Sequence, residues 1–231
     1  MSQNQSTPSR EVARRAFASE FNDAGYTFTE SDDERAPVYA LLPTGESSNR
    51  VFFVGTLTEK EDVGDDSEYW RGRIVDPTGT FFVYAGQYQP EAASKLRDLE
   101  PPAYVAVVGK PRTYETDDGT VRVSVRPESI TETDAATRDR WVAETARRTV
   151  ERVAAFDDEG NEYARMAREE YDLDPETYKA AALSALEDLD ESGDELAGDS
   201  DAGDAAAPDA DESGPDSAVS DETDPAGTPE P

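Results

Sequence analysis

The sequence contains no cysteine and no histidine among its 231 residues. These absences exclude a disulfide framework and the zinc sites that proteins build from thiolate and imidazole ligands. They also exclude catalysis that depends on an imidazole base or a thiolate nucleophile. The phosphate-binding, serine-hydrolase and zinc-protease motifs GxxxxGK[ST], GxSxG and HExxH are missing as well. We therefore expect a protein that is not an enzyme and that carries no metal ion and no cofactor.

Long apolar runs are also missing. The longest run has about five residues, whereas a helix needs roughly 20 to span a bilayer. The first residues, MSQNQSTPSR, lack the apolar stretch of a secretory signal. We expect a cytoplasmic protein without membrane contact.

Lysine is scarce, supplying 4 of the 22 basic residues against 53 acidic ones, and the net charge is −31. The acidic C-terminal stretch does not account for this, because residues 1–189 alone still carry a net charge of −16. Such a composition is typical of proteins that work in a molar-salt cytosol, where charges are screened beyond roughly 3 Å. In that salt, lysine–phosphate contacts lose most of their counterion-release gain, so a nucleic-acid partner would be held mainly by base stacking.

The stretch from Val51 to Ile130 consists of short alternating strands separated by turn signals. The turns DPTG at Asp76–Gly79 and DDG at Asp117–Gly119 each supply a glycine where a tight turn can require positive φ. One helical segment, PEAASKLRDLE, stands before the fourth of five strands. This order is typical of the OB-fold, a Greek-key barrel that binds oligonucleotides on one face. The sequence therefore predicts an all-β OB-fold barrel of five strands with an N-terminal helix and a C-terminal α-helical extension.

The chain divides into four segments. We expect an N-terminal helix and extended segment over 1–48, the OB-fold over 49–133, assembly helices over 134–190 and a disordered acidic tail over 191–231. Within the first segment, apolar spacing predicts a helix over 8–24, extended chain at 26–29 and 38–42, and a loop at 43–49.

Alternation along the second and third barrel strands suggests a binding face. A small barrel interior has no room for two unpaired guanidinium groups, so we expect Arg71 and Arg73 to point outward, with Phe82 and Tyr84 beside them. Aromatic rings flanked by cations form a stacking platform for single-stranded nucleic acid, although the same rings could pack beneath the N-terminal helix or a partner subunit. The hairpin of the last two strands should flank this face, unless its cations only pair locally in solvent. The full set of nucleic-acid-binding candidates is Arg71, Arg73, Phe82, Tyr84, Arg112, Tyr114 and Arg122.

A long amphipathic helix is expected over about 135–156, with Asp134 as its N-cap. Its apolar stripe needs a covering surface, which could be the chain's own barrel or another subunit, and helices at 161–189 could cover it in a monomer. The partner-binding candidates on this helix are Trp141, Val142, Ala146, Val150 and Val153.

Several segments resemble known proteins. Four segments are similar to the middle subunit of replication protein A: RVFFVG at 50–55, RIVDPTG at 73–79, YVAVVGKPR at 104–112 and VRPESI at 125–130. EYWRGRIVDPTGTFFVYAGQYQPEAA resembles the haloarchaeal replication protein A-associated proteins, which are acidic OB-fold proteins. This resemblance implies maintenance of single-stranded DNA in replication and repair, in complex with a larger replication protein A subunit. It also implies that the helix Ala135–Phe156 mediates assembly, whereas no winged-helix ending is recognisable.

Two interpretations remain open at this stage. The chain could bind single-stranded DNA directly, as an accessory subunit of a replication protein A complex. Alternatively, it could be an assembly subunit that docks a larger DNA-binding subunit without contacting nucleic acid itself.

Overall fold

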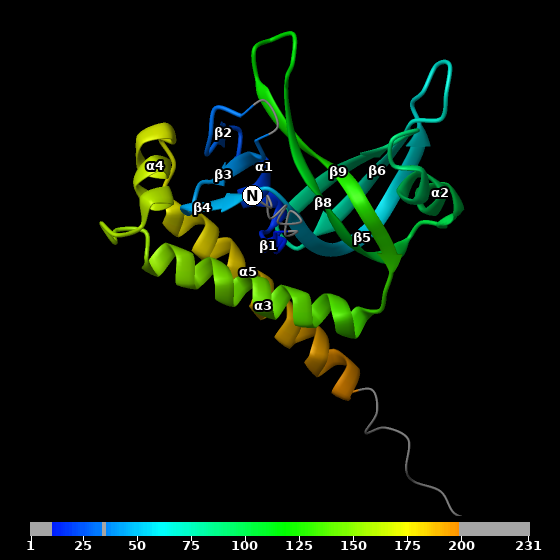
Figure 1. The fold of residues 1–231 in the computed structure, drawn as a ribbon. Coiled ribbons are helices and arrows are strands. Elements are labelled where there is room, and N and C mark those ends of the chain that lie inside the picture. The colour runs from blue at the N-terminus through cyan, green and yellow to red at the C-terminus, as the bar shows by residue number, and fades with distance from the viewer. Residues whose placement is uncertain (1–10, 34–35, 199–231) are drawn as a thin grey trace, which may run out of the picture.

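A barrel of five strands forms the centre of the molecule, with two long helices packed together against it (Figure 1). The computed structural model describes residues 11–33 and 36–198. The sheet order is β5-β6-β7-β9-β8, pairing of β5 with β8 closes the barrel, and α2 stands between β7 and β8 in the chain. This arrangement is an OB-fold, so the predicted fold class is confirmed. The barrel elements are β5 (Val51–Asp62), β6 (Trp70–Asp76), β7 (Gly79–Ala85), α2 (Pro90–Asp98), β8 (Ala103–Glu115) and β9 (Val121–Glu132).

Aromatic and branched side chains fill the barrel interior. The rings of Phe53 and Phe81 stack with 3.9 Å between their centroids, and Ile74 is fully buried beside them. Trp70 is partly buried against the same core. The predicted alternation of β6, with its arginines outside, is therefore confirmed.

The N-terminal segment packs against this core without forming the long helix predicted over 8–24. Only α1 (Ala18–Asn22) is helical, and β1 (Arg14–Arg15) pairs in parallel with β5. The backbone N–H of Ala18 donates to Oδ2 of Asp76 at 2.8 Å, and the N–H of Ser19 donates to Thr78 Oγ1 at 3.1 Å. The β6–β7 turn thus satisfies the first N–H groups of the helix, which fixes its start at Ala18. The predicted extent of this helix was wrong, and residues 8–10 lie outside the described chain.

A small antiparallel sheet follows, made of β2 (Thr27–Thr29), β3 (Val38–Leu42) and β4 (Glu46–Ser48). The loop predicted at 43–49 was wrong in part, because β4 pairs with β3. Gly45 makes the turn between them with a φ of 84°, and a Cβ there would lie 2.5 Å from Ala164 Cα. Only glycine allows both this backbone conformation and this close approach.

Three helices form the C-terminal part: α3 (Ala135–Ala154), α4 (Glu162–Glu170) and α5 (Pro175–Gly198). The Asp134 carboxylate accepts the N–H of Thr137 at 2.7 Å, so the predicted N-cap is confirmed. The α5 helix continues to Gly198, past the boundary expected at residue 190, and the rest of the predicted acidic tail lies outside the described residues. Among the helices of residues 11–198, none is long and apolar enough to cross a membrane.

One hydrophobic core joins three of the four predicted segments. The same buried cluster contains Phe17 from the N-terminus, Phe53 from the barrel, Trp141 from α3 and Ala185 from α5. The N-terminal segment and the C-terminal helices are therefore part of the barrel's own packing.

We expect Gly109→Ala to destabilise the fold by about 1–3 kcal/mol, the usual cost of overpacking a tight contact. Gly109 lies at a register shift between β8 and β9, where a Cβ would stand 2.6 Å from the Arg126 carbonyl oxygen. Urea unfolding in molar potassium chloride measures the loss. Gly79→Ala is the matched control, because its nearest neighbour would lie 3.4 Å away. Equal stability of the two variants would contradict this account.

Candidate nucleic-acid interface

A groove with a volume of about 670 Å³ lies between β7, the turn before α2 and the β8–β9 hairpin, which rises above the barrel in Figure 1. We call it the aromatic groove. Its lining residues are Tyr69, Tyr84, Tyr88, Gln89, Arg112, Thr113, Tyr114, Ser124, Val125 and Arg126.

Four of the ten tyrosines of the chain line this groove. The rings of Tyr69 and Tyr84 stack with 5.8 Å between centroids and 25° between planes. Tyr88, on the turn before α2, exposes 78% of its surface, and Tyr114 is also exposed. Burial raises the pKa of Tyr84, and the neighbouring Tyr114 raises it further, so the hydroxyl stays protonated. Open ring faces of this kind can stack on nucleobases.

The charge of the groove is opposite in sign to the charge of the whole chain. No carboxylate is among the ten lining residues, although the chain has 53 acidic residues. The two cations of the groove, Arg112 and Arg126, make no ion pair with any residue in the described part of the chain. Their guanidinium groups are therefore free to bind an anion.

The outward arginines of β6 differ in this respect. Arg71 pairs with Glu61 at 2.6 Å and Arg73 pairs with Glu59 at 3.5 Å. Each arginine is the register partner of its glutamate across the β5–β6 ladder, so these are cross-strand ion pairs. Their charge is already compensated within the barrel wall.

The structure thus separates the predicted nucleic-acid-binding residues into two groups. Tyr84, Arg112 and Tyr114 lie together in the aromatic groove. The remaining four lie outside its lining: Arg71 and Arg73 beside β5, Phe82 on the outer face of β7 opposite Arg73, and Arg122 exposed on β9 opposite Tyr114.

Sequence reasoning missed Tyr69, Tyr88 and Gln89 as lining residues. Tyr69 stands just before β6, and the other two lie in the turn between β7 and α2. Alternation places Tyr69 on the same outward face as Arg71 and Arg73, but it carries no information for the two residues in the turn. The available signal was an aromatic residue inside a turn, AGQYQP, where no core position requires one.

The predicted partner-binding stripe of α3 is covered within this chain. Trp141 packs edge-on against Phe17 at 5.4 Å, and its Nε1–H donates to the Phe52 carbonyl oxygen at 3.3 Å. The α3 helix packs mainly along α5 and also contacts β5. Four of the five candidates are buried, namely Trp141, Val142, Ala146 and Val153, whereas Val150 is half-buried. These side chains do not form an open docking surface in this conformation.

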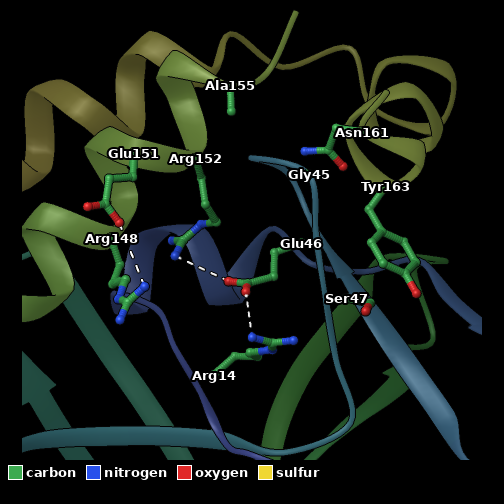
Figure 2. A pocket seen from close by; sticks show the side chains of 10 residues that line it. All are labelled: Arg14, Gly45, Glu46, Ser47, Arg148, Glu151, Arg152, Ala155, Asn161 and Tyr163. Carbon is green, nitrogen blue, oxygen red and sulfur yellow. Dashed lines mark hydrogen bonds and ion pairs between the residues drawn. The ribbon is translucent and has the colours of Figure 1, made fainter. Parts of the chain in front are cut away.

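A polar cluster fixes the C-terminal end of α3 to the N-terminal elements. Arg152 donates from Nη2 to Glu20 Oε2 at 2.6 Å and from Nε to Thr44 Oγ1 at 2.7 Å. Figure 2 shows Arg14 and Arg152 on either side of Glu46. The Nη1 atom of Arg14 lies 3.1 Å from Glu46 Oε1, and that of Arg152 lies 3.4 Å from Glu46 Oε2. The Arg152 side chain is 11% exposed and that of Glu20 is 1% exposed. All of these charges are compensated, which indicates a structural role.

The described residues contain no group of three or more acidic side chains arranged to hold a metal ion.

Comparisons with known proteins concern the fold. No family model and no curated protein matches the chain. The solved S. pombe Stn1–Ten1 complex is similar at 13% identity, over 55% of this chain and 82% of that chain, with a TM-score of 0.42. The second single-stranded DNA-binding protein of Mycobacterium smegmatis is similar at 19% identity, over 37% and 87%, with a TM-score of 0.32. Asparaginyl-tRNA synthetase from Pyrococcus horikoshii is similar at 16% identity, over 44% of this chain and 31% of that chain, with a TM-score of 0.30.

Proposed function

We propose that this protein binds single-stranded DNA in the aromatic groove. The observation that carries the proposal is the composition of the groove: four tyrosines, two arginines without ion pairs among the described residues, and no carboxylate, in a chain of net charge −31. The chain is strongly acidic, so a surface patch that only kept it soluble would be expected to carry Asp and Glu side chains.

The groove supports a simple division of roles. The exposed rings of Tyr88 and Tyr114 receive bases, each stack contributing about 1–3 kcal/mol without regard to sequence. Arg112 and Arg126 bind the phosphates between them. The rings of Tyr69 and Tyr84 stack on each other, and this pair forms one side of the groove, against which a base can pack.

The sequence resemblance supports a more specific role as an accessory subunit of a replication protein A complex in DNA replication and repair. The acidic, lysine-poor composition supports work in a molar-salt archaeal cytosol, where stacking outlasts electrostatic attraction. In the alternative role, the chain only docks a larger subunit. Docking through the α3 stripe would require α5 and the barrel to release it, so the direct-binding role fits this conformation better.

Fluorescence anisotropy in potassium chloride from about 0.5 to 3 M tests the proposal with labelled oligothymidylate, the matching duplex and a single-stranded RNA. We expect single strands to bind better than duplex. Two phosphate contacts predict a slope of log K against log salt of roughly −1.4, so affinity should fall only about tenfold over this range. Absence of single-strand binding by the chain alone, with binding seen once the larger subunit is added, would count against direct binding and favour the docking role.

A further inference from the structure

A second hollow continues the aromatic groove toward the N-terminal sheet. It has a volume of about 800 Å³ and shares five lining residues with the aromatic groove, among them Tyr88, Arg112 and Arg126. We call the part beyond these shared residues the distal groove. Its walls include Lys110, Pro111 and Pro127 of the β8–β9 hairpin and Asn49, Pro37 and Val38 near β3.

The β8–β9 wall of this continuous groove carries a row of cations. Lys110 and Arg112 stand two residues apart on β8, about 6.6 Å along the strand, and Arg126 is the register partner of Lys110 on β9. Like the two arginines, Lys110 makes no ion pair with any described residue. The row therefore runs from the aromatic groove into the distal groove without an ion pair to any acid in the described part of the chain.

Two carboxylates are among the described lining residues of this hollow, and one of them is already neutralised. Arg50 donates to both oxygens of Glu128, the Nη2 bond measuring 2.8 Å, and a third bond joins Arg50 to the Glu11 carbonyl oxygen. The other carboxylate, Glu91, lies in the first turn of α2, where the helix dipole favours negative charge. Among the described lining residues, the cations Lys110, Arg112 and Arg126 thus outnumber the one acid, Glu91, that has no cationic partner here.

Exposed apolar surface accompanies these charges. Val38 exposes 56% of its surface on β3, and Tyr88 stands at the junction of the two hollows. A row of cations flanked by apolar and aromatic surface matches the alternating phosphates and bases of a nucleic-acid strand. A protein segment would have to supply regularly spaced acids to match the same row.

We infer that a single strand of DNA continues from the aromatic groove past Tyr88 into the distal groove, so that the small N-terminal sheet forms part of the binding site. This inference rests on the proposed function. It predicts a footprint in the longer part of the range of about 4–16 nucleotides seen for one OB-fold.

Anisotropy titrations of the full chain with oligothymidylates of about 6, 12 and 24 nucleotides test the inference. Lys110→Glu should weaken binding of the two longer strands by about tenfold and change binding of the shortest less than about twofold. Val38→Lys adds a cation at an exposed position of the distal wall, so it should tighten binding of the longer strands only. Lys179→Glu on α5, outside both hollows, is the matched control.

The outcomes separate this inference from the proposed function. Suppose that the unmodified chain binds all three oligonucleotides, and that each variant changes the affinity by the same factor at every length or does not change it. The strand then does not enter the distal groove, and the inference is wrong. If the unmodified chain binds no oligonucleotide, the proposed function and this inference both fail.

Discussion

Replacement of Tyr88 and Tyr114 together by alanine is expected to lower the affinity for single-stranded DNA at least about 30-fold. Each ring supplies a stack of about 1–3 kcal/mol, so two lost stacks cost 2 kcal/mol or more. Both side chains are exposed, so their removal should leave the barrel folded. The loss should persist in molar potassium chloride, since stacking is not screened. Anisotropy titration measures the affinity, and circular dichroism checks the fold.

Two matched variants make this prediction specific. The double variant Tyr88→Phe with Tyr114→Phe keeps both rings and should bind within about threefold of the unmodified chain. Phe82→Ala removes a ring that is 37% exposed on β7 but lies outside the groove lining, and its effect should be equally small. If Phe82→Ala instead lowers the affinity strongly, and the double alanine variant of Tyr88 and Tyr114 binds normally, the binding face lies on the β6–β7 surface.

Arg152→Ala is expected to reduce the free energy of unfolding by about 3–5 kcal/mol, the cost of leaving one charge of a buried pair uncompensated. Glu20, 1% exposed, would lose its bond of 2.6 Å to Arg152 and keep only the hydroxyl of Thr44. Salt screens a buried pair weakly, so the effect should be visible in molar potassium chloride. Urea unfolding followed by circular dichroism measures it.

Arg147→Ala on the same helix is the control. Arg147 pairs with Glu144 and Glu151 at the exposed surface, where ion pairs contribute about 0–1 kcal/mol. The double variant Glu20→Gln with Arg152→Met removes both charges and should recover part of the loss. If Arg152→Ala and Arg147→Ala cost the same, the polar cluster does not hold α3 in place.

The barrel was predictable because its signals are local. Alternation along β6 and β7, the Asp76–Gly79 turn and the helix before β8 each depend on residues close in the sequence. The Asp134 cap was predictable for the same reason, since one side chain and one nearby N–H suffice.

The rest depended on contacts between distant residues. The N-terminal segment has helical spacing, but bonds from Ala18 and Ser19 to the β6–β7 turn, 58 and 59 residues away, decide where its helix begins. The apolar stripe of α3 is compatible with any covering surface, so its sequence could not distinguish α5 from another subunit.

The candidate site shows the same limit. The charge compensation of Arg71 and Arg73 depends on the register of β5 against β6, including an irregularity between Leu57 and Glu59. The aromatic groove gathers side chains from β7, a turn and both strands of the last hairpin, and only the folded chain brings these together.

The shared core has a consequence for the order in which the chain can fold during synthesis. One buried cluster contains Phe17, Phe53, Trp141 and Ala185. When the last barrel strand, β9, leaves the ribosome, this core is still open on the side that α3 and α5 will cover. At about 5–20 residues per second, the last residue of α5 follows roughly 3–13 s later. During that interval the nascent barrel exposes apolar surface, which makes this stage of synthesis the one most prone to aggregation.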